Sequence, residues 1–248
     1  MFIDVHCHLD YFKDSELPQI ISKNKNLKII LSNGTNFESN ERILKISEKF
    51  PQVKSALGLY PIEALKLSDK EISEVLNQIK SNKDKILAIG EVGMDFKESD
   101  EKEKQISIFK KIISLSIKLD KHLIVHSRKA ELECIEILEK EKAQKVIMHC
   151  FSGKIKLAQR IISNNWFLSI PANIPNSQHF QKIVELTPIT QLFCETDSPY
   201  LHPFREFPNY PYNVVESYKK IAEIKKLSSK EVENQIEKNF EKLFGCKI

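Results

Sequence analysis

The chain has 248 residues, and its 38 Lys and Arg against 34 Asp and Glu give a formal net charge of +4 with His neutral. Its 29% charged and 41% hydrophobic residues are typical of a globular protein and exclude a disordered or fibrous one. Because no apolar run approaches the ~18 residues of a membrane helix and no signal-peptide pattern opens the chain, we expect a soluble, cytoplasmic protein without a membrane partner.

Eight short segments with few charges and several β-branched or aromatic residues predict eight strands. In chain order these segments are 2–6, 28–32, 53–57, 86–90, 122–126, 145–149, 166–170 and 191–195. Amphipathic segments lie between them, including a long one over about 100–119 and a last one over about 229–244. Two helix starts carry the S-x-x-E pattern of a capping box, Ser68 with Glu71 and Ser228 with Glu231.

Strands that alternate with helices indicate a parallel sheet, and eight such units in about 250 residues predict a closed TIM (β/α)8 barrel. We expect a single domain over residues 1–248. A doubly wound open sheet is the alternative fold. With only 6 Gly and neither a G-x-G-x-x-G nor a P-loop motif, the sequence argues against an enzyme that uses a nucleotide cofactor.

His6 and His8 stand two apart at the end of the first predicted strand. Side chains two apart on a strand point to the same face, so both imidazoles would lie inward at the rim where barrel enzymes have their active sites. On its own, this pair is equally compatible with two ordinary surface or core histidines.

The ends of other predicted strands carry residues of the same chemistry. His126 and His149 end the fifth and sixth strands, Glu91 follows the fourth, and Asp197 follows the eighth. Four imidazoles and two carboxylates exceed what one tetrahedral ion needs and suit two divalent ions that share a carboxylate. Imidazole favours Zn, Mn, Co or Fe, while the carboxylates keep Mg available. The alternative is a polar rim that holds no metal.

Seven segments resemble the TatD-like metal-dependent deoxyribonucleases, a branch of the amidohydrolase superfamily. They occur in the family's order and span nearly the whole chain: IDVHCHLD (3–10), ALGLYPIE (56–63), AIGEVGMDF (88–96), IVHSRKA (124–130), MHCFSGK (148–154), ETDSPYL (195–201) and NYPYNV (209–214).

This resemblance implies a TIM barrel with two metal ions and a 3′ exonuclease that cleaves phosphodiester bonds in DNA, with RNA accepted by some members. Glu91 would bridge the ions, where related amidohydrolases often use a carboxylated Lys, and Asp197 would also act as the general base. The implied metal ligands are His6, His8, Glu91, His126, His149 and Asp197.

Substrate contacts are expected from three further residues. The planar guanidinium of Arg128 can bind a phosphate, or it can form an ion pair with an acidic neighbour at the rim. Arg205, on the loop after the eighth strand, offers the same chemistry. Tyr60 can stack on a terminal base of a single strand, or it can pack against Pro61 under a loop. Glu195 lies two residues before Asp197 and so is expected to point to the same face, where it would orient a metal ligand.

Two departures from the family pattern affect the substrate more than the metals. The family usually has G-x-H-P-H after the third strand, whereas Tyr60 and Ile62 occupy the two histidine positions here. The family often has Arg-Gly before its Asn-x-Pro segment, whereas Glu206 follows Arg205 and adds negative charge.

Three functions are therefore open: a metal-dependent 3′ exodeoxyribonuclease, an amide or ester hydrolase acting on a small molecule or aminoacyl group, and a metal-bound protein without catalytic activity. The mild net charge permits a polyanionic substrate without indicating one, and no obligate protein partner is evident. The five cysteines are odd in number and form no C-x-x-C pair, so we expect reduced thiols rather than a zinc knuckle or disulfides.

Overall fold

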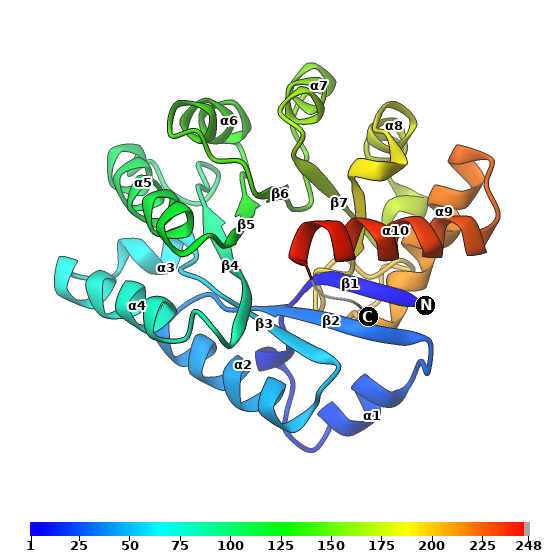
Figure 1. The fold of residues 1–248 in the computed structure, drawn as a ribbon, viewed down its shortest axis with the longest axis horizontal. Coiled ribbons are helices and arrows are strands. Elements are labelled where there is room, and N and C mark those ends of the chain that lie inside the picture. Colours follow the sequence, from blue (N-terminus) through cyan, green and yellow to red (C-terminus); the bar gives the residue numbers. More distant parts are fainter. Residues whose placement is uncertain (246–248) are drawn as a thin grey trace.

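Eight parallel strands in chain order form the centre of the molecule, and a ring of helices surrounds them (Figure 1). The computed structural model describes residues 1–245. The strands are β1 (Phe2–Cys7), β2 (Leu27–Asn33), β3 (Val53–Leu57), β4 (Ile86–Gly93), β5 (His122–His126), β6 (Val146–Met148), β7 (Phe167–Pro171) and β8 (Leu192–Glu195). The predicted TIM barrel is confirmed, and the doubly wound alternative is wrong because its strand order would reverse within the sheet.

The ring is closed where the first and last strands meet. The backbone N–H of Asp197 donates to the carbonyl of His6 at 2.9 Å, and that of His8 donates to the carbonyl of Ser198 at 2.8 Å. Below these bonds, the N–H of Thr196 donates to the buried carboxylate of Asp4 at 3.0 Å. Residues at the ends of the first and last strands are therefore fixed side by side at the carboxyl end of the barrel.

The helices follow the amphipathic segments of the sequence. They are α1 (Leu17–Ser22), α2 (Phe37–Lys49), α3 (Pro61–Leu65), α4 (Asp69–Ser81), α5 (Lys102–Leu119), α6 (Glu131–Lys140), α7 (Ile155–Ser163), α8 (Gln178–Leu186), α9 (Val215–Lys225) and α10 (Ser229–Phe244). Both predicted capping boxes form, at Ser68 for α4 and at Ser228 for α10. Asn239 of α10 donates to the carbonyls of Ile189 and Leu192, which holds this helix against the start of β8.

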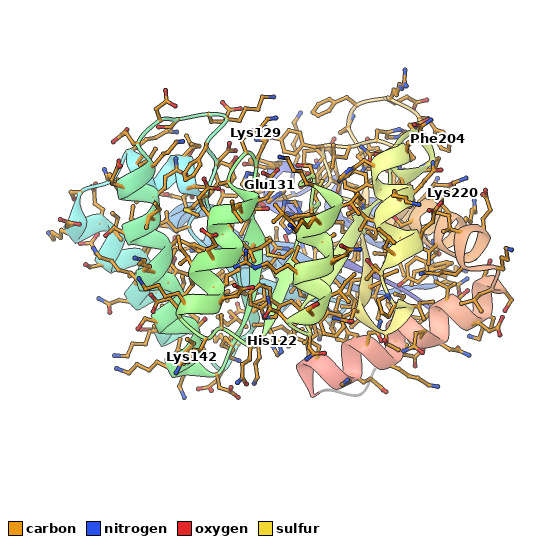
Figure 2. The ribbon with its side chains drawn as sticks, turned by 90° about the horizontal axis from the view of Figure 1, so that it is seen from above. His122, Lys129, Glu131, Lys142, Phe204 and Lys220 are labelled. Carbon is orange, nitrogen blue, oxygen red and sulfur yellow. The ribbon has the colours of Figure 1, made fainter. Side chains whose placement is uncertain are left out.

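The two ends of the barrel differ in which loops they carry. Lys129 and Phe204, in the loops after β5 and β8, lie at one end of the barrel, while His122 and Lys142 lie at the other (Figure 2). The carboxyl ends of all eight strands thus point toward a single face of the molecule, and the sequence places its chemically active residues there.

Most strand boundaries agree with the expected ones to within one residue at each end, and two of the differences concern the expected ligands. β4 continues three residues further, to Gly93, so Glu91 lies within the strand rather than after it. β6 is shorter by one residue at each end, and His149 lies in the turn that follows, where Cys150 adopts a positive φ of 43°. Strand ends depend on local backbone turns, which the pattern of apolar residues does not encode.

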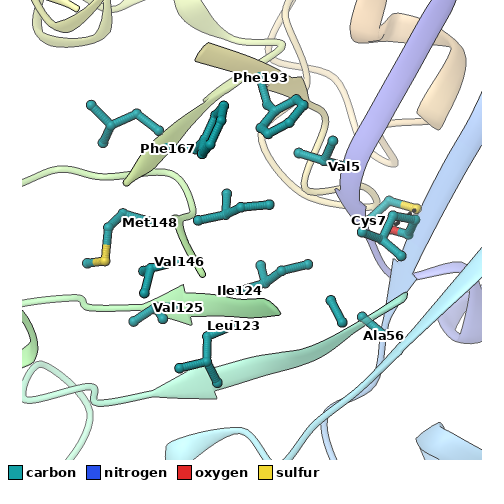
Figure 3. Packing of buried hydrophobic residues seen from close by; sticks show 14 of the residues in the cluster. Val5, Cys7, Ala56, Leu123, Ile124, Val125, Val146, Met148, Phe167 and Phe193 are labelled. Atoms are coloured by element: carbon teal, nitrogen blue, oxygen red, sulfur yellow. Dashed lines mark hydrogen bonds between the residues drawn. The ribbon is translucent and has the colours of Figure 1, made fainter. Parts of the chain in front are cut away.

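Apolar side chains fill the interior of the barrel and the space between the strands and the helices. The rings of Phe167 and Phe193 pack with their centroids 4.9 Å apart, and Val5 lies near them in the same cluster (Figure 3). Cys7 is also buried in this core, away from the ligand side chains of its neighbours His6 and His8. The barrel is therefore packed, and access to its interior is confined to the rim.

The four cysteines in the described residues, Cys7, Cys134, Cys150 and Cys194, are free thiols as expected, while Cys246 lies outside that range. Within residues 1–245, no helix is both long enough and apolar enough to cross a lipid bilayer.

Candidate metal centre

A cavity of about 860 Å³ opens at the carboxyl ends of the strands. Its wall includes five of the six expected metal ligands, and the sixth, His6, lies buried directly beneath them. Tyr60 and Arg128 also line it, so two of the three expected substrate-binding residues share the cavity with the ligands. The five ligands in the wall are His8, Glu91, His126, His149 and Asp197.

Glu91 lies at the centre of the cluster, and its two carboxylate oxygens face different histidines. Oε2 lies 3.7 Å from Nε2 of His6 and 3.4 Å from Nε2 of His8. Oε1 lies 2.8 Å from Nδ1 of His126 and 3.4 Å from Nε2 of His149. The four imidazoles therefore form two groups, one on each oxygen of the same carboxylate.

Asp197 completes the first of these groups. Its Oδ1 lies 3.4 Å from Nε2 of His6 and 3.5 Å from Nε2 of His8. The residue has a positive φ of 53°, a conformation that Asp tolerates better than most residues, and this turn brings its carboxylate back over β1. His6 near the end of β1 and His8 directly after this strand thus meet Asp197 from the other side of the barrel seam.

The residues present fit divalent ions. Three sets of ligand atoms lie within 4.8 Å of one another: His6–His8–Asp197, Glu91–His126–His149 and His6–His149–Glu195. Both ring nitrogens of His6 are buried without a hydrogen-bond partner among the described residues, and a buried imidazole without a partner is costly unless an ion occupies the space beside it. This mixture of imidazole and carboxylate suits zinc, manganese, cobalt or iron, and it leaves magnesium available.

Further residues orient the imidazoles through their second ring nitrogens. Nδ1 of His8 lies 2.9 Å from the carbonyl oxygen of Asn33, and Nδ1 of His149 lies 3.3 Å from Oε1 of Glu195. Glu195 is itself held by the hydroxyl of Ser169. Such contacts set which nitrogen is free to bind an ion, and Glu195 has the supporting position that its strand parity suggested.

Two glycines allow the ligand-bearing segments to approach one another. A Cβ atom on Gly58 would lie 2.4 Å from the backbone nitrogen of Glu91, so any larger residue would push that ligand away. Gly93 has a φ of +137°, and a Cβ there would lie 2.0 Å from the carbonyl oxygen of His126. Both positions require glycine for close backbone contact, which places Glu91 beside His126.

The carboxylates and imidazoles stabilise each other's charged forms. Burial opposes ionisation of Glu91, but hydrogen bonds from His126 and His149 hold its pKa well below the usual range. Burial also lowers the pKa of His8, yet its hydrogen bond to Asp197 and the charge of Glu91 raise it overall to about 9. An ion that binds beside His8 must therefore displace a proton from its imidazole.

Asp95 is the residue that the sequence reasoning missed. Its Oδ2 accepts hydrogen bonds from the hydroxyl of Tyr60 at 2.8 Å and from Nε of Arg128 at 2.8 Å, and it lies 2.9 Å from Nε2 of His126. Asp95 is fully buried, and it belongs to the AIGEVGMDF segment four residues after Glu91. The sequence carries one signal for it, since Asp95 is an acidic residue only two positions after the buried strand β4.

The structure places Tyr60 and Arg128 against this carboxylate. The Tyr60 ring lies edge-on to His126 with centroids 5.1 Å apart, and its hydroxyl is held by Asp95. Arg128 forms ion pairs with Asp95 at 2.6 Å and with Glu98 at 2.9 Å, while 38% of its side chain remains exposed. The acidic neighbours that were the alternative to phosphate binding are thus present, although the guanidinium still lines the cavity.

Arg205 and Glu206 lie apart from the ligands. Both are exposed on the loop after β8, and neither belongs to the wall of the metal cavity. The carboxylate of Glu206 lies 3.9 Å from Nε2 of His202, so its negative charge faces that histidine.

A TIM barrel whose rim gathers imidazole and carboxylate ligands in this way has the architecture of the metal-dependent hydrolases. Residues 3–245 match the family model described as TatD related DNase, so the chain belongs to this family. It is a metal-dependent hydrolase of the TatD type, as the resemblance of its motifs indicated.

Individual relatives cover the chain over its whole length. An uncharacterized metal-dependent hydrolase of Methanocaldococcus jannaschii is 37% identical and aligns with 100% of this chain and 98% of its own length. The human protein named deoxyribonuclease TATDN3 is 34% identical over 98% of this chain and 94% of its own. The crystal structure of the Escherichia coli TatD homologue YjjV has the same fold, with a TM-score of 0.91, 24% identity, and coverage of 99% and 98% of the two chains.

Proposed function

We propose that this chain is a 3′-to-5′ exodeoxyribonuclease that uses two divalent ions to hydrolyse phosphodiester bonds, with single-stranded DNA or DNA 3′ ends as its substrate. RNA is the second polymer to test. The name of the human relative supports DNA as the substrate class, since that relative aligns with 98% of this chain.

One observation carries the proposal of two ions. The two oxygens of Glu91 face separate pairs of imidazoles, which is the arrangement expected of a carboxylate that bridges two ions. When bound, divalent ions supply positive charge that stabilises the phosphoryl oxygens and activates water as a nucleophile.

The protein's own part in the reaction falls to Asp197. Burial opposes ionisation of this carboxyl, but the imidazoles of His6 and His8, with Nε2 atoms 3.4 and 3.5 Å from its Oδ1, hold its pKa far below the usual range, so it is ionised at neutral pH. Asp197 also lines the cavity, where its carboxylate can take a proton from the attacking water. We therefore assign it the role of general base in addition to that of a ligand.

The test uses protein reconstituted with Mn²⁺, Mg²⁺, Zn²⁺ or Co²⁺ and a single-stranded oligonucleotide labelled at its 5′ end. We expect a ladder that shortens from the 3′ end with release of nucleoside monophosphates, and complete loss of activity after chelation. Asp197→Asn should retain at least one ion by elemental analysis while losing most turnover. Internal cleavage would contradict the exonuclease, and full turnover by metal-loaded Asp197→Asn would remove its role as base.

A second candidate is an amide or ester hydrolase, because the same kind of site can attack a carbonyl group. One feature favours it: Asp95 and Glu98 already compensate the positive charge of Arg128, so its guanidinium attracts a phosphate less strongly. Hydrolysis of an amide and ester panel at rates above those on oligonucleotides would select this candidate.

A further inference from the structure

Two tyrosines stand on the wall of the metal cavity with much of their surface uncovered. Tyr11 ends the short 3-10 helix η1 (Leu9–Tyr11) that follows β1, and Tyr200 lies in the loop that follows β8. They are 52% and 49% exposed, and both line the cavity that holds the ligands. Large aromatic side chains left open beside a reaction centre indicate a binding surface for a flat apolar group.

Both tyrosines are fixed close to one half of the ligand cluster. The Tyr11 ring lies 5.5 Å from the His8 ring, and the backbone N–H of Tyr200 donates to the carbonyl of Asp197 at 2.8 Å. β1 and β8 are neighbours at the seam, whereas Arg128 follows β5 on the far side of the ring. A substrate at the ligands would thus meet aromatic rings on one side and a guanidinium on the other.

The mutual geometry of the rings suits stacking. Their centroids lie 6.2 Å apart and their planes are inclined by 77°. A planar group stacked on the face of one ring would therefore be steeply inclined to the other ring and could contact it edge-to-face, and both arrangements are favourable for aromatic systems. Tyr60 is less suited, because its hydroxyl is held by Asp95 and its ring lies edge-on to His126.

We propose that Tyr11 and Tyr200 together bind an unpaired base at the 3′ end of the nucleic-acid strand while its phosphodiester lies at the ligands. This inference rests on the proposed nuclease function and narrows its substrate to strands whose terminal bases are unpaired. A base inside a duplex has both faces covered by its neighbours, so a tyrosine reaches such a face only after the base has left the stack.

The chain supplies matched controls. Phe204 and Phe207 are even more exposed, at 63% and 75%, and lie on the same loop as Tyr200, but neither lines the cavity. Phe204 stands at the carboxyl-end rim in Figure 2. If any exposed aromatic side chain bound DNA, these two residues would contribute to DNA affinity as much as the tyrosines.

The experiment measures binding of metal-loaded protein to two fluorescent single-stranded oligonucleotides by anisotropy. Phosphorothioate linkages at the 3′ end slow cleavage in both, and one oligonucleotide lacks the bases of its last two nucleotides. Stacking on an aromatic side chain changes affinity on the order of 5- to 150-fold per base. We expect the wild-type protein to bind the complete strand about tenfold more tightly than the abasic one.

Tyr11→Ala and Tyr200→Ala should each reduce this ratio toward one by weakening binding of the complete strand only. Tyr11→Phe, Tyr200→Phe and Phe207→Ala should keep the wild-type ratio. An unchanged ratio in both alanine variants, or an equal loss for both strands, would overturn the role of the tyrosines while leaving the nuclease intact. If the wild-type protein binds neither strand and also fails to cleave the same complete strand without phosphorothioate linkages, the nuclease function is overturned, and this inference with it.

Discussion

Oδ2 of Asp95 lies 2.9 Å from Nε2 of His126, on the side of the ring opposite to Glu91, which faces Nδ1 at 2.8 Å. A buried carboxylate in this position favours the tautomer with its proton on Nε2, because the proton can then be donated to Asp95. Nδ1 is thereby left with a free electron pair that points into the ligand cluster.

Asp95→Asn should therefore weaken metal binding by about 10- to 100-fold, the usual effect of removing the group that orients a ligand. A chelator competition titration measures this directly on folded protein. Glu98→Gln is the matched control, since Glu98 also contacts Arg128 but lies 49% exposed and does not contact His126. Equal metal affinity in Asp95→Asn and wild type would show that Asp95 serves Arg128 and Tyr60 alone.

Glu91→Gln should lower the metal content more than any other single change in the cluster. Both groups of imidazoles lose an anionic ligand when this one carboxylate is neutralised. Elemental analysis after dialysis should find fewer than one ion per chain, with the barrel intact by circular dichroism. Two tightly retained ions in this variant would contradict the bridging position.

Arg128 provides a test of phosphate binding. Arg128→Ala should reduce kcat/KM on a phosphodiester by an amount equivalent to about 1.5–3 kcal/mol, the range for a hydrogen bond to a charged group, with little effect on a neutral ester. Glu98→Gln should act in the opposite direction and lower KM, because it removes a carboxylate that competes for the guanidinium at 2.9 Å. Equal losses on both substrates in Arg128→Ala would assign that residue a structural role.

His122 should make the barrel less stable in mild acid. It is buried at the start of β5 with its ring 4.8 Å from that of Phe244, and burial together with the charge of Lys145 lowers its pKa to about 4. The folded protein keeps this imidazole neutral, while the unfolded chain takes up a proton near pH 6.5. Stability is therefore present above pH 6.5 and is lost as the pH falls toward 4.

Between pH 7.5 and pH 5 this one group should reduce the free energy of unfolding by about 2 kcal/mol. Urea denaturation of wild type and His122→Phe at both pH values isolates the effect, because the ligand histidines titrate in both proteins. The drop in stability should be smaller in the variant by that amount. If the two proteins lose equal stability, the imidazole of His122 is already free to protonate in the fold.

The sequence predicted the barrel well because its information is local and repeated. Strand patterns, capping boxes at Ser68 and Ser228, and the alternation of His6 and His8 all follow from neighbouring residues. The set of side chains that contact one carboxylate cannot be predicted from neighbouring residues in this way. The contacts of Asp95 with Tyr60 and Arg128 join residues 35 and 33 positions apart through side-chain geometry that no periodicity records.

The seam between β1 and β8 also determines at which stage of biosynthesis the candidate metal centre can form. His6 and Asp197 belong to one group of candidate ligands although 191 positions separate them (197 − 6), and the bond between their backbones helps close the ring. A ribosome that adds about 5–20 residues per second needs roughly 10–40 s to pass from the first residue to the second. Until then, the group of His6 and His8 lacks the carboxylate of Asp197, so the complete site can take up ions only after most of the chain has been made.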